Sequence, residues 1–125
     1  MKKTLTLLLA VLASLAVNAA HAHGSTKPKH GGVVQLVGET SVELVTRADG
    51  AEVYVMYDGE DVATGNMTGK LTIDNGGAKS EAALQSAGGN KLEAKGVKIS
   101  SGSKVAVTLT DTETASKTTA RFTIK

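Results

Sequence analysis

The sequence predicts an all-β domain, an immunoglobulin-like antiparallel β-sandwich of about seven or eight strands, with a small β-barrel as the alternative. Two observations predict this fold class. From residue 33 onward, apolar and polar residues alternate in short runs, which is the period of a half-buried strand. Glycine-containing turns separate the runs at intervals of about 8 to 12 residues, a spacing typical of sandwiches and barrels. The chain has no cysteine, so its core must hold the fold without disulfide bonds.

The runs and turns place the strands along the chain. Each run follows a turn and carries apolar side chains at every second position. Residues 81–87 have some helical propensity, but glycine pairs on both sides leave too short a segment for a stable helix, so a strand is predicted at residues 79–86. The expected strands are residues 33–37, 41–47, 52–58, 70–74, 79–86, 90–94, 104–110 and 118–125, with a short segment around Val62.

The alternation also assigns side chains to the core. In the second expected strand, Val42 and Leu44 face inward, and Glu43 lies on the polar face. The third strand carries Tyr54 and Met56 on the face opposite its valines, so both of its faces are partly apolar. The inner residues predicted for the later strands are Leu71, Ile73, Ala82, Leu84, Val105, Val107, Leu109, Ala120, Phe122 and Ile124.

Residues 1–22 have the three parts of a cleaved secretory signal peptide. Lys2 and Lys3 give a positive start, an apolar run of about 13 residues follows, and small residues end it. The apolar run is shorter than the roughly 20 residues that a membrane-crossing helix needs. Cleavage after Ala22 or after Ala19 fits the small-x-small rule, and Ala22 is favoured.

The mature chain is expected to be a near-neutral protein of the bacterial periplasm. The 14 Lys and Arg residues include the two signal lysines, so cleavage leaves them equal in number to the 12 acidic residues. With no tryptophan, one phenylalanine and two tyrosines, the chain has few surfaces for base stacking, and neither nucleic acid nor, after cleavage, a membrane is an expected partner. Residues 23–31, which are polar and contain the single proline, are expected to be a flexible lead-in to one β domain at residues 32–125.

Sequence motifs of catalysis are lacking, so an enzyme is not expected. No serine stands in a Gly-x-Ser-x-Gly motif, and no cysteine is available as a nucleophile. The glycine pairs at residues 76–77 and 88–89 lie at expected hairpin turns and do not precede helices, so they do not predict a phosphate site. Glu60 and Asp61 stand side by side in an expected loop, where we interpret them as solvated.

Histidine and methionine side chains are the candidates for a metal site. After signal cleavage, His23 would offer its α-amino group and imidazole as a chelating pair suited to Cu(II) and other imidazole-binding metals. His30 would add a second imidazole, and Glu43 an oxygen ligand if the first hairpin brings the two together. Met56 and Met67 are thioethers of the kind that select Cu(I), provided that they converge. The ordinary alternatives are a solvated histidine tail, a surface carboxylate and methionines that pack at the core or the sheet edge.

Short segments spread over the mature chain carry a family resemblance. They are HGGVV at 30–34, ELV at 43–45, VYV at 53–55, GKLT at 69–72, AGGNKL at 87–92 and RFTI at 121–124. Together they resemble a family of small exported β-domains that are associated with bacterial heavy-metal efflux systems of the resistance-nodulation type. The resemblance implies a periplasmic accessory role in metal resistance, through metal capture or delivery to an efflux adaptor, and it supplies no established ligand set.

We therefore expect a non-enzymatic accessory protein that binds copper or another divalent transition metal weakly and serves a periplasmic efflux adaptor. The lack of tryptophan and of a dense methionine cluster argues against tight Cu(I) binding. The alternative is a structural or protein-interaction module without a metal, which would dock a partner through a sheet edge or through the face of Tyr54 and Met56.

Overall fold

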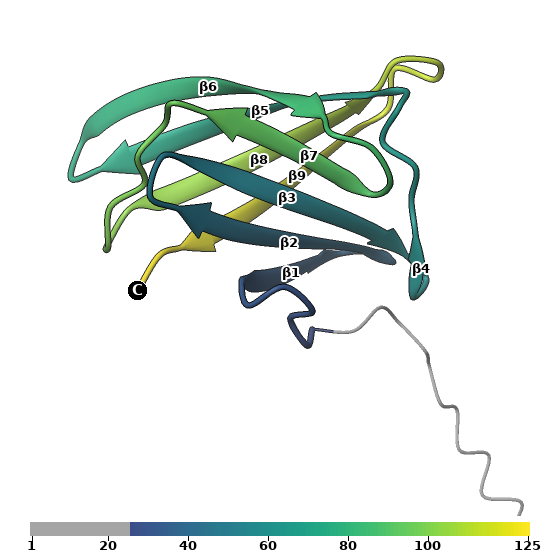
Figure 1. Ribbon diagram of the computed structural model, residues 1–125, viewed down its shortest axis with the longest axis horizontal. Coiled ribbons are helices and arrows are strands. Elements are labelled where there is room, and N and C mark those ends of the chain that lie inside the picture. The colour runs from purple at the N-terminus through teal and green to yellow at the C-terminus, as the bar shows by residue number, and fades with distance from the viewer. Residues whose placement is uncertain (1–25) are drawn as a thin grey trace, which may run out of the picture.

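The computed structural model describes residues 26–125 as one antiparallel β-sheet of nine strands that is nearly closed into a barrel (Figure 1). The all-β prediction is confirmed, and within the described residues no helix occurs, hence none that could cross a membrane. The expected signal peptide and His23 lie outside these residues. The strands are β1 (Val33–Val37), β2 (Thr40–Arg47), β3 (Gly50–Tyr57), β4 (Glu60–Asp61), β5 (Met67–Asn75), β6 (Ala78–Ser86), β7 (Lys91–Lys95), β8 (Lys104–Asp111) and β9 (Lys117–Thr123).

The sheet folds back on itself so that its two halves face each other across the core. One half has the order β1-β2-β3-β7 and the other the order β6-β5-β8-β9, while β4 pairs only with β3. In Figure 1 the first half lies in front of the second. The halves are joined at two paired positions between β6 and β7, and β1 lies against β9 without a backbone ladder among the described strands. The barrel is therefore weakly closed on both sides.

The core lies between these halves and follows the predicted alternation. Val42, Leu44 and the other predicted inner residues are buried, apart from Ala82 and Ile124, which are partly buried and pack against the core. The fully or nearly buried apolar residues of the cluster are Val42, Leu44, Ala51, Val53, Val55, Leu71, Ile73, Leu84, Leu92, Ala94, Val105, Val107, Leu109, Ala120 and Phe122.

The segment that has helical propensity is strand β6, as predicted. It is joined to β5 by a two-residue turn in which Gly76 and Gly77 have φ angles of 62° and 97°. Positive φ at both positions is the requirement of a type I′ turn, whose twist matches that of the flanking strands. Asp74 Oδ1 accepts a hydrogen bond of 2.8 Å from the Gly77 N–H, which closes the turn further.

Thr64 and Ser103 are hydroxyl residues with no exposed surface. Thr64, with no exposed surface, has its Oγ1 2.9 Å from the Lys91 carbonyl and 2.8 Å from Ser86 Oγ, so it ties the connection before β5 to the β6–β7 turn. Ser103 is equally buried, but its Oγ has no hydrogen-bond partner. The Thr64 hydroxyl is therefore expected to stabilise the fold, and the Ser103 hydroxyl is not.

Candidate functional site

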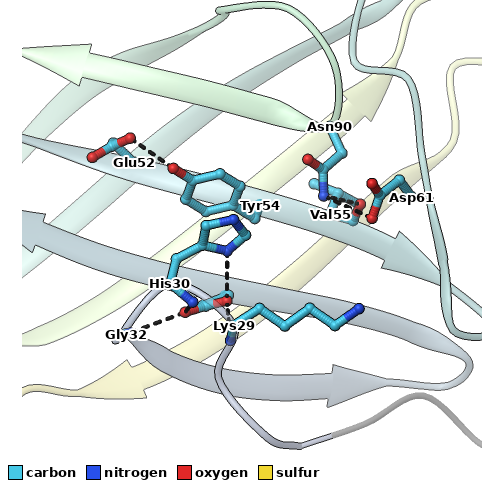
Figure 2. Close-up of polar contacts among 9 residues, drawn as sticks. Lys29, His30, Gly32, Glu52, Tyr54, Val55, Asp61 and Asn90 are labelled. Atoms are coloured by element: carbon cyan, nitrogen blue, oxygen red, sulfur yellow. Dashed lines mark hydrogen bonds and ion pairs between the residues drawn. The ribbon is translucent and has the colours of Figure 1, made fainter.

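The carboxylate of Glu43 lies on the outer face of β2 and is nevertheless buried, with 5% of the residue exposed. The segment before β1 crosses over it. Its Oε1 accepts the N–H of Lys29 at 3.0 Å, and its Oε2 accepts those of His30 and Gly32, each at 2.9 Å (Figure 2). We call Glu43 together with residues 29–32 the N-terminal clamp.

The two glycines of the clamp explain how the chain can cross the strand so closely. Gly31 has a φ of +76°, which a residue with a side chain rarely adopts. At Gly32, a Cβ atom would lie 2.3 Å from the carbonyl oxygen of Leu44 and 2.8 Å from a methyl group of Val45. The close approach also covers Val45, which is only 4% exposed. The Gly-Gly pair is therefore a geometric requirement of this site.

Two contacts hold the imidazole of His30, one with Glu43 at an edge of the ring and one with Tyr54 on a face of the ring. Its Nδ1 lies 3.1 Å from Glu43 Oε1, and its ring stacks on Tyr54 with 3.5 Å between centroids and 5° between planes (Figure 2). The Tyr54 hydroxyl donates a hydrogen bond of 2.8 Å to Glu52 Oε2. Because a carboxylate only accepts, the proton of the His30–Glu43 contact belongs to Nδ1; in the neutral form of the ring the lone pair is then on Nε2.

Burial raises the pKa of the Glu43 carboxyl, but its hydrogen bonds act more strongly in the opposite direction. The N–H groups of Gly32 and Lys29, the imidazole of His30 and the N–H of His30 all stabilise the charged form, so the pKa lies below its ordinary value. Glu43 is therefore a charged acceptor at neutral pH.

A second carboxylate, Glu52, anchors the aromatic platform under His30. Lys91 Nζ lies 2.8 Å from Glu52 Oε2, and Arg47 Nε donates to Glu52 Oε1. The hydrogen bonds from Lys91, Arg47 and Tyr54 outweigh burial and lower the pKa of Glu52 to about 2. Burial and the bond to Glu52 raise the pKa of Tyr54, so its hydroxyl remains a donor at neutral pH.

A further polar cluster lies at the end of β3. Asn90 Nδ2 is 3.2 Å from the Val55 carbonyl and 3.3 Å from Asp61 Oδ1 (Figure 2). The Val55 N–H in turn donates to the Asn90 carbonyl at 3.0 Å. These contacts fasten the turn before β7 to β3 and β4, and they add no imidazole or thioether to the site.

The structure brings together two of the predicted metal-binding residues and separates two others. The proximity of His30 and Glu43 is confirmed, although the crossing segment before β1 creates it rather than the β1–β2 hairpin alone. Met56 lies on the outer face of β3, whereas Met67 packs against the core, so the methionines do not converge. His23 lies outside the described residues. Within residues 26–125, no group of three or more His, Cys, Asp or Glu side chains is arranged to hold a metal ion.

The end of the expected flexible lead-in is held in place in the structure. Lys29 and His30 donate their backbone N–H groups to Glu43. Buried carboxylates are normally hydrogen-bonded, and here the donors come from the segment before β1 rather than from β1 itself. Sequence reasoning also missed the stacking of His30 on Tyr54, a half-buried residue, so the face proposed for partner docking is covered there by the clamp. The adjacent glycines at residues 31–32 were the available signal for a close crossing.

No family model, curated protein or solved structure matches this chain. The resemblance to exported domains of metal-efflux systems therefore stays a prediction. Inference about function depends on the chemistry of the N-terminal clamp.

Proposed function

We propose that this protein is a non-enzymatic periplasmic accessory of heavy-metal resistance that binds copper or another divalent transition-metal ion through His30. The observation that carries the proposal is the 3.1 Å contact between His30 Nδ1 and Glu43 Oε1. Histidines that bind metals almost always donate their other ring N–H to a carboxylate, a backbone carbonyl or water, which fixes the tautomer and orients the metal-binding nitrogen. His30 has this arrangement, and 37% of its side chain is exposed.

The remaining ligands are proposed to come from the chain before the described residues. His30 is the only histidine of residues 26–125, so a single imidazole is available there. Cleavage after Ala22 would start the mature chain at His23, whose α-amino group and imidazole are two nitrogen ligands on one residue. Nitrogen sites of this kind bind Cu(II) most tightly among the divalent first-row metals. The clamp fixes the second imidazole seven residues further along the chain.

The proposed partner is the periplasmic adaptor of a metal-efflux system, as the family resemblance implies. A weak site suits a carrier, because a metal ion that is to be passed on must dissociate from it. Deletion of the gene is expected to lower the copper tolerance of the host. Unchanged tolerance to copper, nickel and zinc would contradict the efflux role and would leave the binding proposal to its own test.

Calorimetric titration of the mature chain, beginning at His23, with Cu(II) and Ni(II) tests the binding proposal. We expect a Kd for Cu(II) below about 0.1 mM, which corresponds to about 5.5 kcal/mol. His30→Ala should weaken binding by at least about 10-fold, since it removes one ligand. Glu43→Gln should weaken it by about 10-fold, as losses of carboxylate partners behind metal-binding histidines do.

Two controls define the site. Lys117→Ala changes an exposed residue of β9 and should leave the affinity unaltered. A mature chain whose His23 α-amino group is acetylated keeps every side chain and loses only that amine as a ligand, so it should bind Cu(II) more weakly than the mature chain. Equal affinities of the mature chain and His30→Ala, or no binding tighter than about 0.1 mM, would refute the proposal.

A further inference from the structure

Strand β6 has one fully paired edge and one edge that is mostly free. It pairs with β5 from Ala78 to Gln85, but with β7 only at Gln85 and Ser86. Beyond those two positions the strands diverge, and a cavity of about 690 Å³ lies between β6 and the segment of residues 95–98. Residues 78–84 therefore have no strand partner on this side among the described parts of the chain.

The type I′ turn identifies the backbone groups that point to the free edge. In such a hairpin the residues that flank the turn, Asn75 and Ala78, form a hydrogen-bonded pair, and hydrogen-bonded and non-hydrogen-bonded pairs then alternate along the ladder. Lys79, Glu81 and Ala83 consequently direct their N–H and C=O groups away from β5. Glu81 and Ala83 also line the cavity beside β6.

The free edge is open to solvent. Residues 78–81 are all exposed, including Ser80, whose side chain is on the inward-facing side of the strand. Figure 1 shows the β5–β6 hairpin reaching the outer limit of the molecule. A strand edge with free backbone donors and acceptors is a template for pairing with another strand.

The charges along the edge select one partner and one register. Lys79 has no ion-pair partner within the described residues, and Glu81 makes only an exposed contact of 3.5 Å with Lys70. We propose that the β6 edge pairs antiparallel with the β6 edge of a second copy of this chain, about a two-fold axis at Ser80. Lys79 of each copy then lies opposite Glu81 of the other, so both cross-strand pairs join opposite charges.

The neighbouring registers are less favourable. An axis at Glu81 places the two glutamates opposite each other, and like charges in that position destabilise a strand pair. An axis at Ala82 places Glu81 opposite Ala83 and forms no charge pair. Since the favoured register exchanges about four backbone hydrogen bonds over a short strand, the dimer is weak and reversible.

Sedimentation equilibrium of the mature chain at concentrations up to about 1 mM tests the proposal. We expect a monomer–dimer equilibrium for the unaltered protein. Lys79→Glu and Glu81→Lys should each weaken dimerisation by about 10-fold or more, because each places like charges at both symmetric positions. The double variant should recover dimerisation. An equimolar mixture of the two single variants should also associate, as opposite charges then meet at both positions.

Two further variants separate this edge from other surfaces. Lys117→Glu makes the same charge change at an exposed position of β9 and should leave dimerisation unaltered. Glu81→Pro removes an N–H that faces the free edge and keeps the β5–β6 ladder, so it should abolish dimerisation with an unchanged circular dichroism spectrum. A protein that stays monomeric up to about 1 mM would overturn the proposal, with the edge charges then acting as guards against pairing. Dimerisation that the single variants do not weaken, or that their mixture does not restore, would also overturn it.

Discussion

Replacement of Glu43 by glutamine is the sharpest perturbation of the N-terminal clamp, because it removes the charge and keeps the shape. In the unaltered protein, Glu43 Oε2 accepts the N–H groups of both His30 and Gly32. The single oxygen of the glutamine can still accept both. The amide nitrogen replaces the oxygen that accepts from Lys29 and from His30 Nδ1. A change of tautomer lets His30 recover its contact, but the Lys29 N–H then faces another donor.

The expected cost follows from these contacts. A hydrogen bond to a charged group contributes about 1.5–3 kcal/mol, and one such bond is lost while the others become neutral. We therefore expect the free energy of unfolding to fall by about 2 kcal/mol at pH 7, which lowers the Tm of a domain of this size by roughly 8–16 °C. Urea denaturation measures the change, and hydrogen exchange at Lys29, His30 and Gly32 shows whether the clamp opens.

The pH dependence of the stability difference between the two proteins is the control for this prediction. The pKa of Glu43 is lower in the folded protein than in the unfolded chain, so its contribution to stability is complete above the unfolded value of about 4.3 and disappears as the pH falls through the folded value. The difference between the unaltered protein and Glu43→Gln should be constant above about pH 5.5 and shrink in acid. Equal unfolding midpoints at pH 7, together with equal exchange rates in the clamp, would refute the clamp as a stabilising contact.

Three other substitutions test separate features of the fold by urea denaturation. Gly32→Ala should lower the free energy of unfolding by about 1–3 kcal/mol, because the new Cβ would lie 2.3 Å from the Leu44 carbonyl oxygen; unaltered stability would show that the crossing segment can move aside. Thr64→Val should cost about 1 kcal/mol through loss of the hydrogen bond to the Lys91 carbonyl, and a stabilised variant would contradict this. Ser103→Ala should leave stability unchanged or raise it by up to about 1 kcal/mol, since its buried hydroxyl has no partner; clear destabilisation would reveal an interaction of that hydroxyl.

The strands could be predicted from the sequence because burial imposes a period of two. Leu71 and Ile73, or Val105 and Val107, alternate with polar residues and are buried as expected. The segment that became β6 shows the limit of local propensity, since its helical tendency gives way to the turn of Gly76 and Gly77. The closure of the sheet could not be predicted, because whether β1 meets β9 depends on accumulated twist and not on any local pattern.

The N-terminal clamp could be predicted only in part, because its burial also depends on segments that are far apart in the sequence. The sequence suggested that Glu43 would lie near His30 if the first hairpin brought them together, and the structure places Glu43 Oε1 3.1 Å from His30 Nδ1. The period-of-two pattern also placed Glu43 on the solvent face of its strand. The residues next to Glu43 in the sequence do not indicate that a crossing segment will bury it. That burial depends on the contact of Gly32 with Leu44, two residues from different segments whose approach is fixed by the sheet register.

His30 belongs to the clamp and is also the proposed metal ligand. Metal binding and closure of the clamp are therefore expected to favour each other. In the proposed site Nε2 of His30 binds the metal while Nδ1 contacts Glu43, so a metal bound there should favour the closed clamp. A ligand that binds only the native state raises its stability by about 2.7 kcal/mol at 100 times its Kd. A metal held by His23 alone would leave the clamp unaffected. Slower hydrogen exchange at Lys29 and Gly32 on addition of Cu(II) is therefore the signature that distinguishes a metal site built on the clamp from one on the preceding chain.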